Sequence, residues 1–238
     1  MKRLLIAALV LSAPLASYAT SYSYSTTGLE SLTHGTAYTW GAVSGGSSSA
    51  LDSAIHSGQK LTSGTITITG LYDWTVESLD VLYVDILNGV QAGVGSKVYD
   101  ASLDSGPDTF KGSDPFVSGG VSGYASSGTV ASGFTYSAVT QVGSYTDTNG
   151  PITSTTLVLT LTGAELTTLD GYLNADYTSG ADLGLGLGPD CHFYDTGVSL
   201  AFTTGSAADN SLTVTMLGAS LVGLADFGRR NKKNALLG

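Results

Sequence analysis

The sequence LTSGTITITGLY, from Leu61 to Tyr72, shows the clearest structural pattern of this chain. Threonine alternates with isoleucine along it, which places Ile66 and Ile68 on one face and the threonines on the other. An alternation with a period of two residues is typical of a half-buried β-strand. We therefore expect a strand here, with its isoleucines facing a hydrophobic core.

Similar patterns recur on both sides of this stretch, separated by turn-forming residues. The run Val81 to Asn88 is apolar on both parities apart from Asp85, which predicts a strand covered on both faces. Asp85 is expected at an outward or rim position, and an inward orientation with a partner stays open. Further strands are expected at residues 37–40, 91–99, 128–131, 134–145, 152–161, 181–188 and 197–204.

Two connections follow from local signals. Asp147 to Pro151 is a strong turn sequence, so residues 134–145 and 152–161 are expected to pair as an antiparallel hairpin. Gly163 to Asp176 carries leucines at intervals of three and four, which predicts a helix. Leu51 to Ile55 is ambiguous. The predicted fold is all-β: an antiparallel, jelly-roll-like β-sandwich with one short helix, formed by residues 20–208.

The composition limits the partners of this body. It keeps three basic residues, Lys60, Lys97 and Lys111, and it contains all 19 acidic residues of the chain except Asp209 and Asp226. Nucleic acid is therefore not expected as a partner, because phosphate binding needs clustered Lys or Arg. Abundant Gly, Ser, Thr and Tyr are typical of an extracellular all-β protein. The single cysteine, Cys191, cannot form an internal disulfide.

The N-terminus has the pattern of a secretory signal peptide, residues 1–19. A short basic segment of Lys2 and Arg3 precedes the apolar run Leu4 to Leu15, and Ser17-Tyr18-Ala19 is a small-x-small cleavage site. The apolar run is too short for a comfortable membrane span. We expect export and cleavage after Ala19.

The C-terminal segment, residues 209–238, combines an apolar run with a basic end. Ser211 to Gly228 is 18 residues long, near the minimum for a transmembrane helix. Asp226 lies near its end, at headgroup depth. The cluster of basic residues after it predicts that everything upstream lies outside the cytoplasm: Arg229, Arg230, Lys232 and Lys233. An amphipathic or buried terminal helix is the alternative.

This tail resembles the C-terminal sorting signals of the PEP-CTERM class, in which a short motif, an apolar helix and an Arg-rich end are recognised by an exosortase in the inner membrane of Gram-negative bacteria. In the variant that begins Val-Pro-Asp-Ser-Gly, the aspartate corresponds to Asp209. The resemblance implies that Asp209, Arg229 and Arg230 belong to the sorting signal. It also implies an exosortase-type membrane protease as a partner, and residence in the inner membrane before release to the cell surface or beyond. The segment 163–204 resembles the C-terminal half of β-sandwich bodies in exosortase-sorted surface proteins.

Two groups of residues are candidate metal ligands. Asp104, Asp108 and Asp114 lie in the longest irregular stretch and are candidates for Ca²⁺, with a solvated turn as the alternative. The sequence PDCHFYD, from Pro189 to Asp195, contains Cys191 and His192, which are zinc ligand types if His34 or His56 joins them. We expect instead a buried cysteine and a histidine whose hydrogen bond fixes the loop.

Two functions remain open from the sequence. One is a structural or adhesive protein of the cell surface, extracellular matrix or biofilm. The other is a carbohydrate-binding module that binds extracellular polysaccharide, with Trp40, Trp74, Tyr72 and Tyr194 stacking on sugar rings. Aromatic residues also fill cores, so the exposure of these rings distinguishes the two. No sequence motif of a nucleophile, zinc protease or nucleotide site occurs, and we do not expect an enzyme or an organic cofactor.

Overall fold

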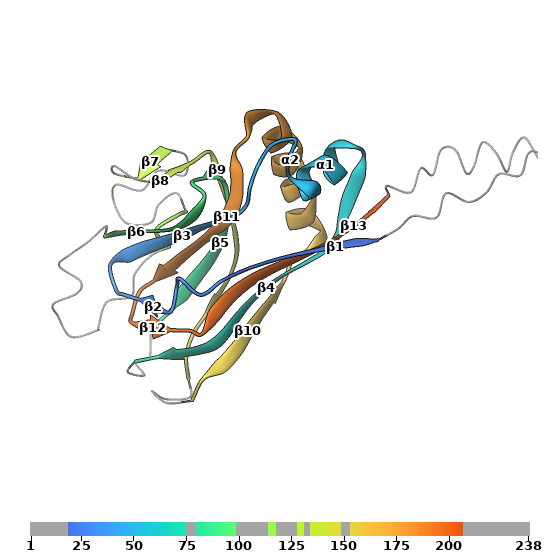
Figure 1. The fold of residues 1–238 in the computed structure, drawn as a ribbon. Coiled ribbons are helices and arrows are strands. Elements are labelled where there is room, and N and C mark those ends of the chain that lie inside the picture. The colour runs from blue at the N-terminus through green and yellow to red at the C-terminus, as the bar shows by residue number, and fades with distance from the viewer. Residues whose placement is uncertain are drawn as a thin grey trace, which may run out of the picture.

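The computed structural model describes residues 19–74, 80–98, 114–117, 128–130, 134–148 and 153–206. These residues form two large β-sheets packed face to face, with two helices at one end (Figure 1). The predicted signal peptide before Ala19 and the predicted sorting tail after Ser206 lie outside the described residues. Within the described ranges, no helix has the length and apolar character that a membrane span requires.

The first sheet is organised around the long strand β4, Gln59–Asp73. Strand β13 pairs with β4 along most of its length, and the short strand β12 continues the same line to the end of β4. Strands β1 and β2 form the next line outward, and β10 covers the opposite edge of β4. All of these pairs are antiparallel, between β1 (Thr20–Thr26), β2 (Ser31–Leu32), β10 (Thr155–Thr160), β12 (Phe193–Tyr194) and β13 (Gly197–Ser206).

The second sheet has five antiparallel strands in the order β6-β3-β11-β5-β9. A separate two-stranded pair, β7 with β8, lies beside it (Figure 1). The bounds are β3 (Thr36–Val43), β5 (Leu82–Val90), β6 (Gly93–Val98), β7 (Gly128–Val130), β8 (Phe134–Tyr136), β9 (Ala138–Tyr145) and β11 (Asp182–Pro189). The predicted all-β, antiparallel sandwich is confirmed, and each predicted strand overlaps a strand of the structure, although residues 134–145 are divided between β8 and β9.

The predicted hairpin between residues 134–145 and 152–161 is wrong. Strand β9 pairs with β5 in the second sheet, whereas β10 pairs with β4 in the first. The connection between them therefore crosses from one sheet to the other. Leu159 of β10 reaches Gly143 of β9 across the gap, since a Cβ atom built on Gly143 would lie 3.2 Å from the leucine side chain. The two strands are neighbours through side-chain packing and not through a shared ladder.

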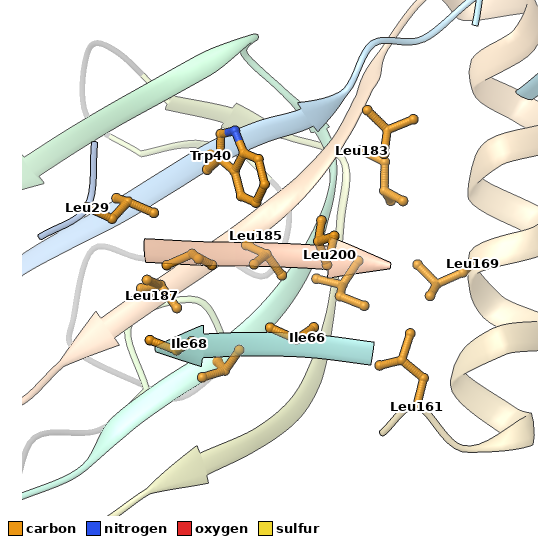
Figure 2. Close-up of a cluster of buried hydrophobic side chains, with 14 of the residues drawn as sticks. Leu29, Trp40, Ile66, Ile68, Leu161, Leu169, Leu183, Leu185, Leu187 and Leu200 are labelled. Carbon is orange, nitrogen blue, oxygen red and sulfur yellow. The ribbon is translucent and has the colours of Figure 1, made fainter. Parts of the chain in front are cut away.

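The main core lies between the two sheets (Figure 2). Ile66 and Ile68 are fully buried in it, as their alternation predicts, opposite Leu183, Leu185 and Leu187 of β11. The glycines that alternate with these leucines face the other side of the second sheet. There a Cβ atom on Gly186 would lie 2.9 Å from the ring of Phe116, so the glycine permits this ring to pack directly on the strand.

Asp85 on β5 is fully buried, although an outward or rim position was expected to expose it. Its neighbours Val84 and Ile86 face the main core, so Asp85 does point away from it. The outer face is covered by a second hydrophobic cluster that includes Phe116 and Tyr136. An outward position on this strand is therefore still a buried position.

The described residues form two helices where the sequence predicted one in the body. Helix α2 spans Gly163–Ser179 and begins with a capping box between Thr162 and Glu165. Its leucine stripe is buried as predicted. The additional helix α1, Ala50–His56, begins at Ser49, whose side chain accepts a hydrogen bond from the Asp52 backbone N–H. Seven residues are too few to display a helical repeat, and contact with α2 stabilises this short helix.

Candidate functional site

Four rings gather on one face of the first sheet. They lie in or directly beside β12 and the end of β4, and β12 lies at the end of the sandwich far from the helices (Figure 1). We call Tyr72, Trp74, His192 and Tyr194 the aromatic patch. Tyr72 and Tyr194 are paired directly across β4 and β12. The Trp74 backbone N–H donates a hydrogen bond to the His192 carbonyl over 2.9 Å, which extends the pairing by one residue on each strand beyond Phe193 and Asp73. Since side chains two residues apart in a strand share a face, the four rings lie on the same side.

The rings of the patch are stacked or tilted against Tyr194. The centroids of Tyr72 and Tyr194 are 5.2 Å apart with planes inclined by 19°, and those of His192 and Tyr194 are 5.9 Å apart at 7°. Trp74 is tilted by 47° at 6.0 Å from Tyr194. Trp74 is 63% exposed, and the other three rings are half-buried. The patch therefore presents an apolar surface to solvent in which Trp74 is the most exposed ring and the other three rings are stacked beside it.

Of the four predicted stacking residues, the structure brings three together. Trp40 is not among them, because it is only 6% exposed and lies in the main core between the sheets (Figure 2). His192 joins the patch although the sequence analysis considered it only as a metal ligand or a loop-fixing residue. The order His192-Phe193-Tyr194 was the signal for its orientation, because side chains two residues apart in a strand lie on the same face.

The residues that alternate with the patch residues along the two strands point inward, beneath the patch. Asp73 and Cys191 are fully buried, and the Cys191 thiol donates a hydrogen bond to Asp73 Oδ1 over 3.3 Å. Asp147 Oδ2 accepts a hydrogen bond of 3.0 Å from the Asp73 backbone N–H. Asp80 is also buried, and one ligand atom each from Asp73, Asp80 and Cys191 lie within 4.8 Å of one another. We call Asp73, Asp80, Asp147 and Cys191 the buried acidic cluster.

The three residues with mutually close ligand atoms have donor types found at divalent-cation sites, two carboxylates and a thiol. They are also held by ordinary hydrogen bonds, of which the thiol-to-carboxylate bond is one. The histidines considered as zinc partners are not members of this group. His56 lies on α1, where Nδ1 is 3.2 Å from Asn174 Oδ1 and the ring stacks on Tyr177.

Two further acidic residues lie on either side of the patch segment. Asp190 is buried and accepts a hydrogen bond from the Val81 backbone N–H. Asp195 is 5% exposed, and its backbone N–H donates to the carbonyl of Glu30 over 3.4 Å. Burial raises the pKa of Asp195 to about 6, the N–H of Gly197 offsets part of this rise, and the charge of Glu30 adds to it.

The predicted Ca²⁺ ligands are only partly described. Asp104 and Asp108 lie outside the described residues. Asp114 is buried over the second sheet, where it accepts hydrogen bonds from the Phe116 backbone N–H (2.9 Å) and from Gln141 Nε2 (3.0 Å). Burial and the adjacent Asp114 carboxylate raise the pKa of Asp85 well above its usual range. In this arrangement Asp114 holds the segment that covers β5.

Comparison with known proteins does not indicate a function for this chain. No protein-family model, curated protein or solved structure matches this chain. The aromatic patch combines the exposed Trp74 ring with three half-buried neighbouring rings. It is therefore the basis of the functional proposal.

Proposed function

We propose that this chain is an exported cell-envelope protein whose body binds glycans through the aromatic patch. The observation that carries the proposal is the exposure of Trp74 beside the near-parallel rings of Tyr72, His192 and Tyr194. Aromatic side chains normally bury most of their surface. Exposed rings on one sheet face suit the apolar C–H face of a sugar ring, which stacks on an aromatic ring without demanding a deep pocket.

We further propose that the body is a jelly-roll-like sandwich. Its strand orders support this, because one sheet runs β1-β13-β4-β10 and the other runs β3-β11-β5-β9. Among these eight strands, successive strands alternate between the sheets except β5 and β9, which pair with each other in the second sheet, and the first and last strands are neighbours. Eight strands in two such sheets are the arrangement of jelly rolls, which include lectin domains.

Export and sorting are the second part of the proposal. They rest on the signal-peptide pattern before Ala19 and on the resemblance of the tail to sorting signals. Intact-mass analysis of the protein from membrane and released fractions of its native host tests them. A body that begins at Thr20 and ends near Asp209 is the expected result. A species that begins at Met1 in every fraction rejects export with cleavage, and one that still carries Arg229 rejects processing of the tail.

Glycan binding is tested by titrating the purified full-length protein with a panel of neutral and charged oligosaccharides in a calorimeter. Trp74→Ala and Tyr194→Ala are expected to weaken binding by about tenfold or more, because each removes a stacking surface. Val158→Ala, which removes an apolar side chain 55% exposed on β10, is the matched control and should bind normally. If no oligosaccharide binds the wild-type protein, the glycan-binding proposal is rejected and a purely structural role in the envelope is favoured.

A further inference from the structure

The aromatic patch is surrounded by carboxylates. Asp73 lies between Tyr72 and Trp74 in sequence, and Asp190 and Asp195 lie on either side of the segment that carries His192 and Tyr194. Glu30 directly precedes Ser31 of β2, and Ser31 pairs with Tyr194 of β12. Glu30 is exposed. Asp80 and Asp147 belong to the buried acidic cluster beneath the same rings. Carboxylates thus lie at the edge of the patch and below it.

Basic groups are scarce near these carboxylates. The described residues include two lysines, and both lie elsewhere. Lys60 is at the helix end of β4, where it forms an ion pair with Asp170 at 3.8 Å, and Lys97 is on the edge strand β6 of the second sheet. Charges inside a protein are screened less by salt than charges in water. The described surroundings of the patch therefore produce a negative potential, which attracts a cation and repels an anion.

Asp195 is the most specific feature of this surrounding. It follows Tyr194 directly, is 5% exposed, and both of its carboxylate oxygens are buried without a hydrogen-bond partner of normal geometry. A buried carboxylate is ordinarily paired with a donor or a cation. Glu30, whose carbonyl accepts the Asp195 backbone N–H, places an exposed carboxylate at the same edge of the patch. Glu30 and Asp195 are thus close enough at this edge for the charge of Glu30 to raise the pKa of Asp195, and neither described lysine lies near them.

We propose that the aromatic patch binds glycans with free amino groups, such as glucosamine residues, in preference to N-acetylated, neutral or acidic ones. This inference rests on the proposed glycan-binding function. The sugar ring stacks on the exposed rings, and its ammonium group lies at the edge where Glu30 contacts it directly. Asp195 lies behind Glu30 and strengthens the attraction. The aromatic faces add to it, because a cation over an aromatic ring is stabilised by the quadrupole of the ring.

The test is calorimetric titration of the full-length protein with four oligosaccharides of equal length: a glucosamine oligomer, its N-acetylated form, a cello-oligosaccharide and a uronic-acid oligomer. The glucosamine oligomer is expected to bind about tenfold more tightly than its N-acetylated form, since a charge-assisted contact replaces a neutral one. This preference should largely disappear in about 1 M salt, where the Debye length falls to about 3 Å. The uronic-acid oligomer is expected to bind most weakly.

Two charge-removing variants locate the effect. Glu30→Gln should reduce the preference for the amino sugar to about twofold or less and leave the affinity for the cello-oligosaccharide unchanged. Glu165→Gln is the control, because it removes the same charge from α2 while glutamine still serves in a capping box. It should leave all four affinities unchanged.

The outcomes separate this inference from the function on which it rests. Equal affinity for the amino and N-acetylated sugars overturns the inference and leaves glycan binding in place, and so does tightest binding of the uronic-acid oligomer. A preference that persists in Glu30→Gln removes Glu30 from the contact and overturns the proposed geometry. If none of the four oligosaccharides binds, the proposed function itself is rejected.

Discussion

Individual carboxyl groups carry much of the chemistry of this protein, and Asp85 is the clearest case. It is fully buried, lies next to Asp114, and has no basic partner among the described residues. Its raised pKa means that the folded state binds a proton more tightly than the unfolded state does. Between the unfolded pKa, about 4, and the higher folded pKa, each rise in pH therefore lowers stability.

We predict that Asp85→Asn stabilises the protein at pH 8. Asparagine has the same shape, needs no proton, and donates a hydrogen bond to Asp114 as a protonated carboxyl would. The gain in the free energy of unfolding should be about 1–3 kcal/mol at pH 8 and smaller at pH 5, measured by urea denaturation. Glu165→Gln is the control, because it removes a carboxylate from the start of α2 while glutamine still serves in the capping box. A gain that is equal at both pH values contradicts the explanation.

Cys191 supplies a second prediction at this scale. Its thiol donates to the buried Asp73 carboxylate, so Cys191→Ala should destabilise the protein by about 1–3 kcal/mol through the loss of a buried donor. Cys191→Ser keeps a donor at the same position and should lose less. Thermal unfolding of the two variants beside the wild type measures the difference. Equal losses would mean that the volume of the sulfur atom, and not its proton, matters at this position.

At the scale of elements, the spacing of side chains explains which strands were predicted and which pairings were not. The Gly-Leu alternation of β11 identifies a strand and its core face, yet only the structure shows that Phe116 covers the glycine face. The turn sequence after β9 identifies a chain reversal, yet β9 and β10 reverse into different sheets. Local sequence sets backbone conformation, whereas the choice of partner depends on surfaces buried by distant segments.

Glycine substitutions test the packing of β11. Gly186→Ala should destabilise the protein by about 1–3 kcal/mol, because the added Cβ would lie 2.9 Å from the Phe116 ring and displace it. Gly171→Ala on α2 is the matched control, since its Cβ would meet no atom within 4 Å. That change should stabilise the protein by about 0.5–1 kcal/mol through helix propensity. Denaturant midpoints of both variants show whether each change stabilises or destabilises the protein. If Gly186→Ala left the free energy of unfolding unchanged, Phe116 would be able to move without cost.

At the scale of the whole molecule, several buried acidic groups act in the same direction on pH dependence. Burial raises the pKa of Asp176 to about 7 and of Asp52 to about 6, and the charges of Asp52 and Asp182 add to the rise in Asp176. Asp195 and Asp85 are raised as well. These groups bind protons more tightly in the folded state, so stability is retained at mildly acidic pH and lost as pH rises from about 4 through 7.

We therefore predict that the melting temperature of the protein is higher near pH 5 than near pH 8. Differential scanning calorimetry across this range measures it. Asp176→Asn should flatten the profile, because the pKa of Asp176, about 7, lies above those of Asp52 and Asp195, about 6. A melting temperature that increases from pH 5 to pH 8 would contradict the prediction.

The sequence alone predicts the strand-rich class, most strand positions, the helix at α2 and the inward face of β4, because these depend on residue periods of two and 3.6. It also identified Tyr72, Trp74 and Tyr194 as stacking candidates. Tertiary structure alone decided that these three meet while Trp40 is buried, that His192 joins them, and that Asp85 is covered. The physical reason is that exposure and proximity depend on how β4, β12 and the segment around Phe116 pack, and those contacts join residues that are far apart in the chain.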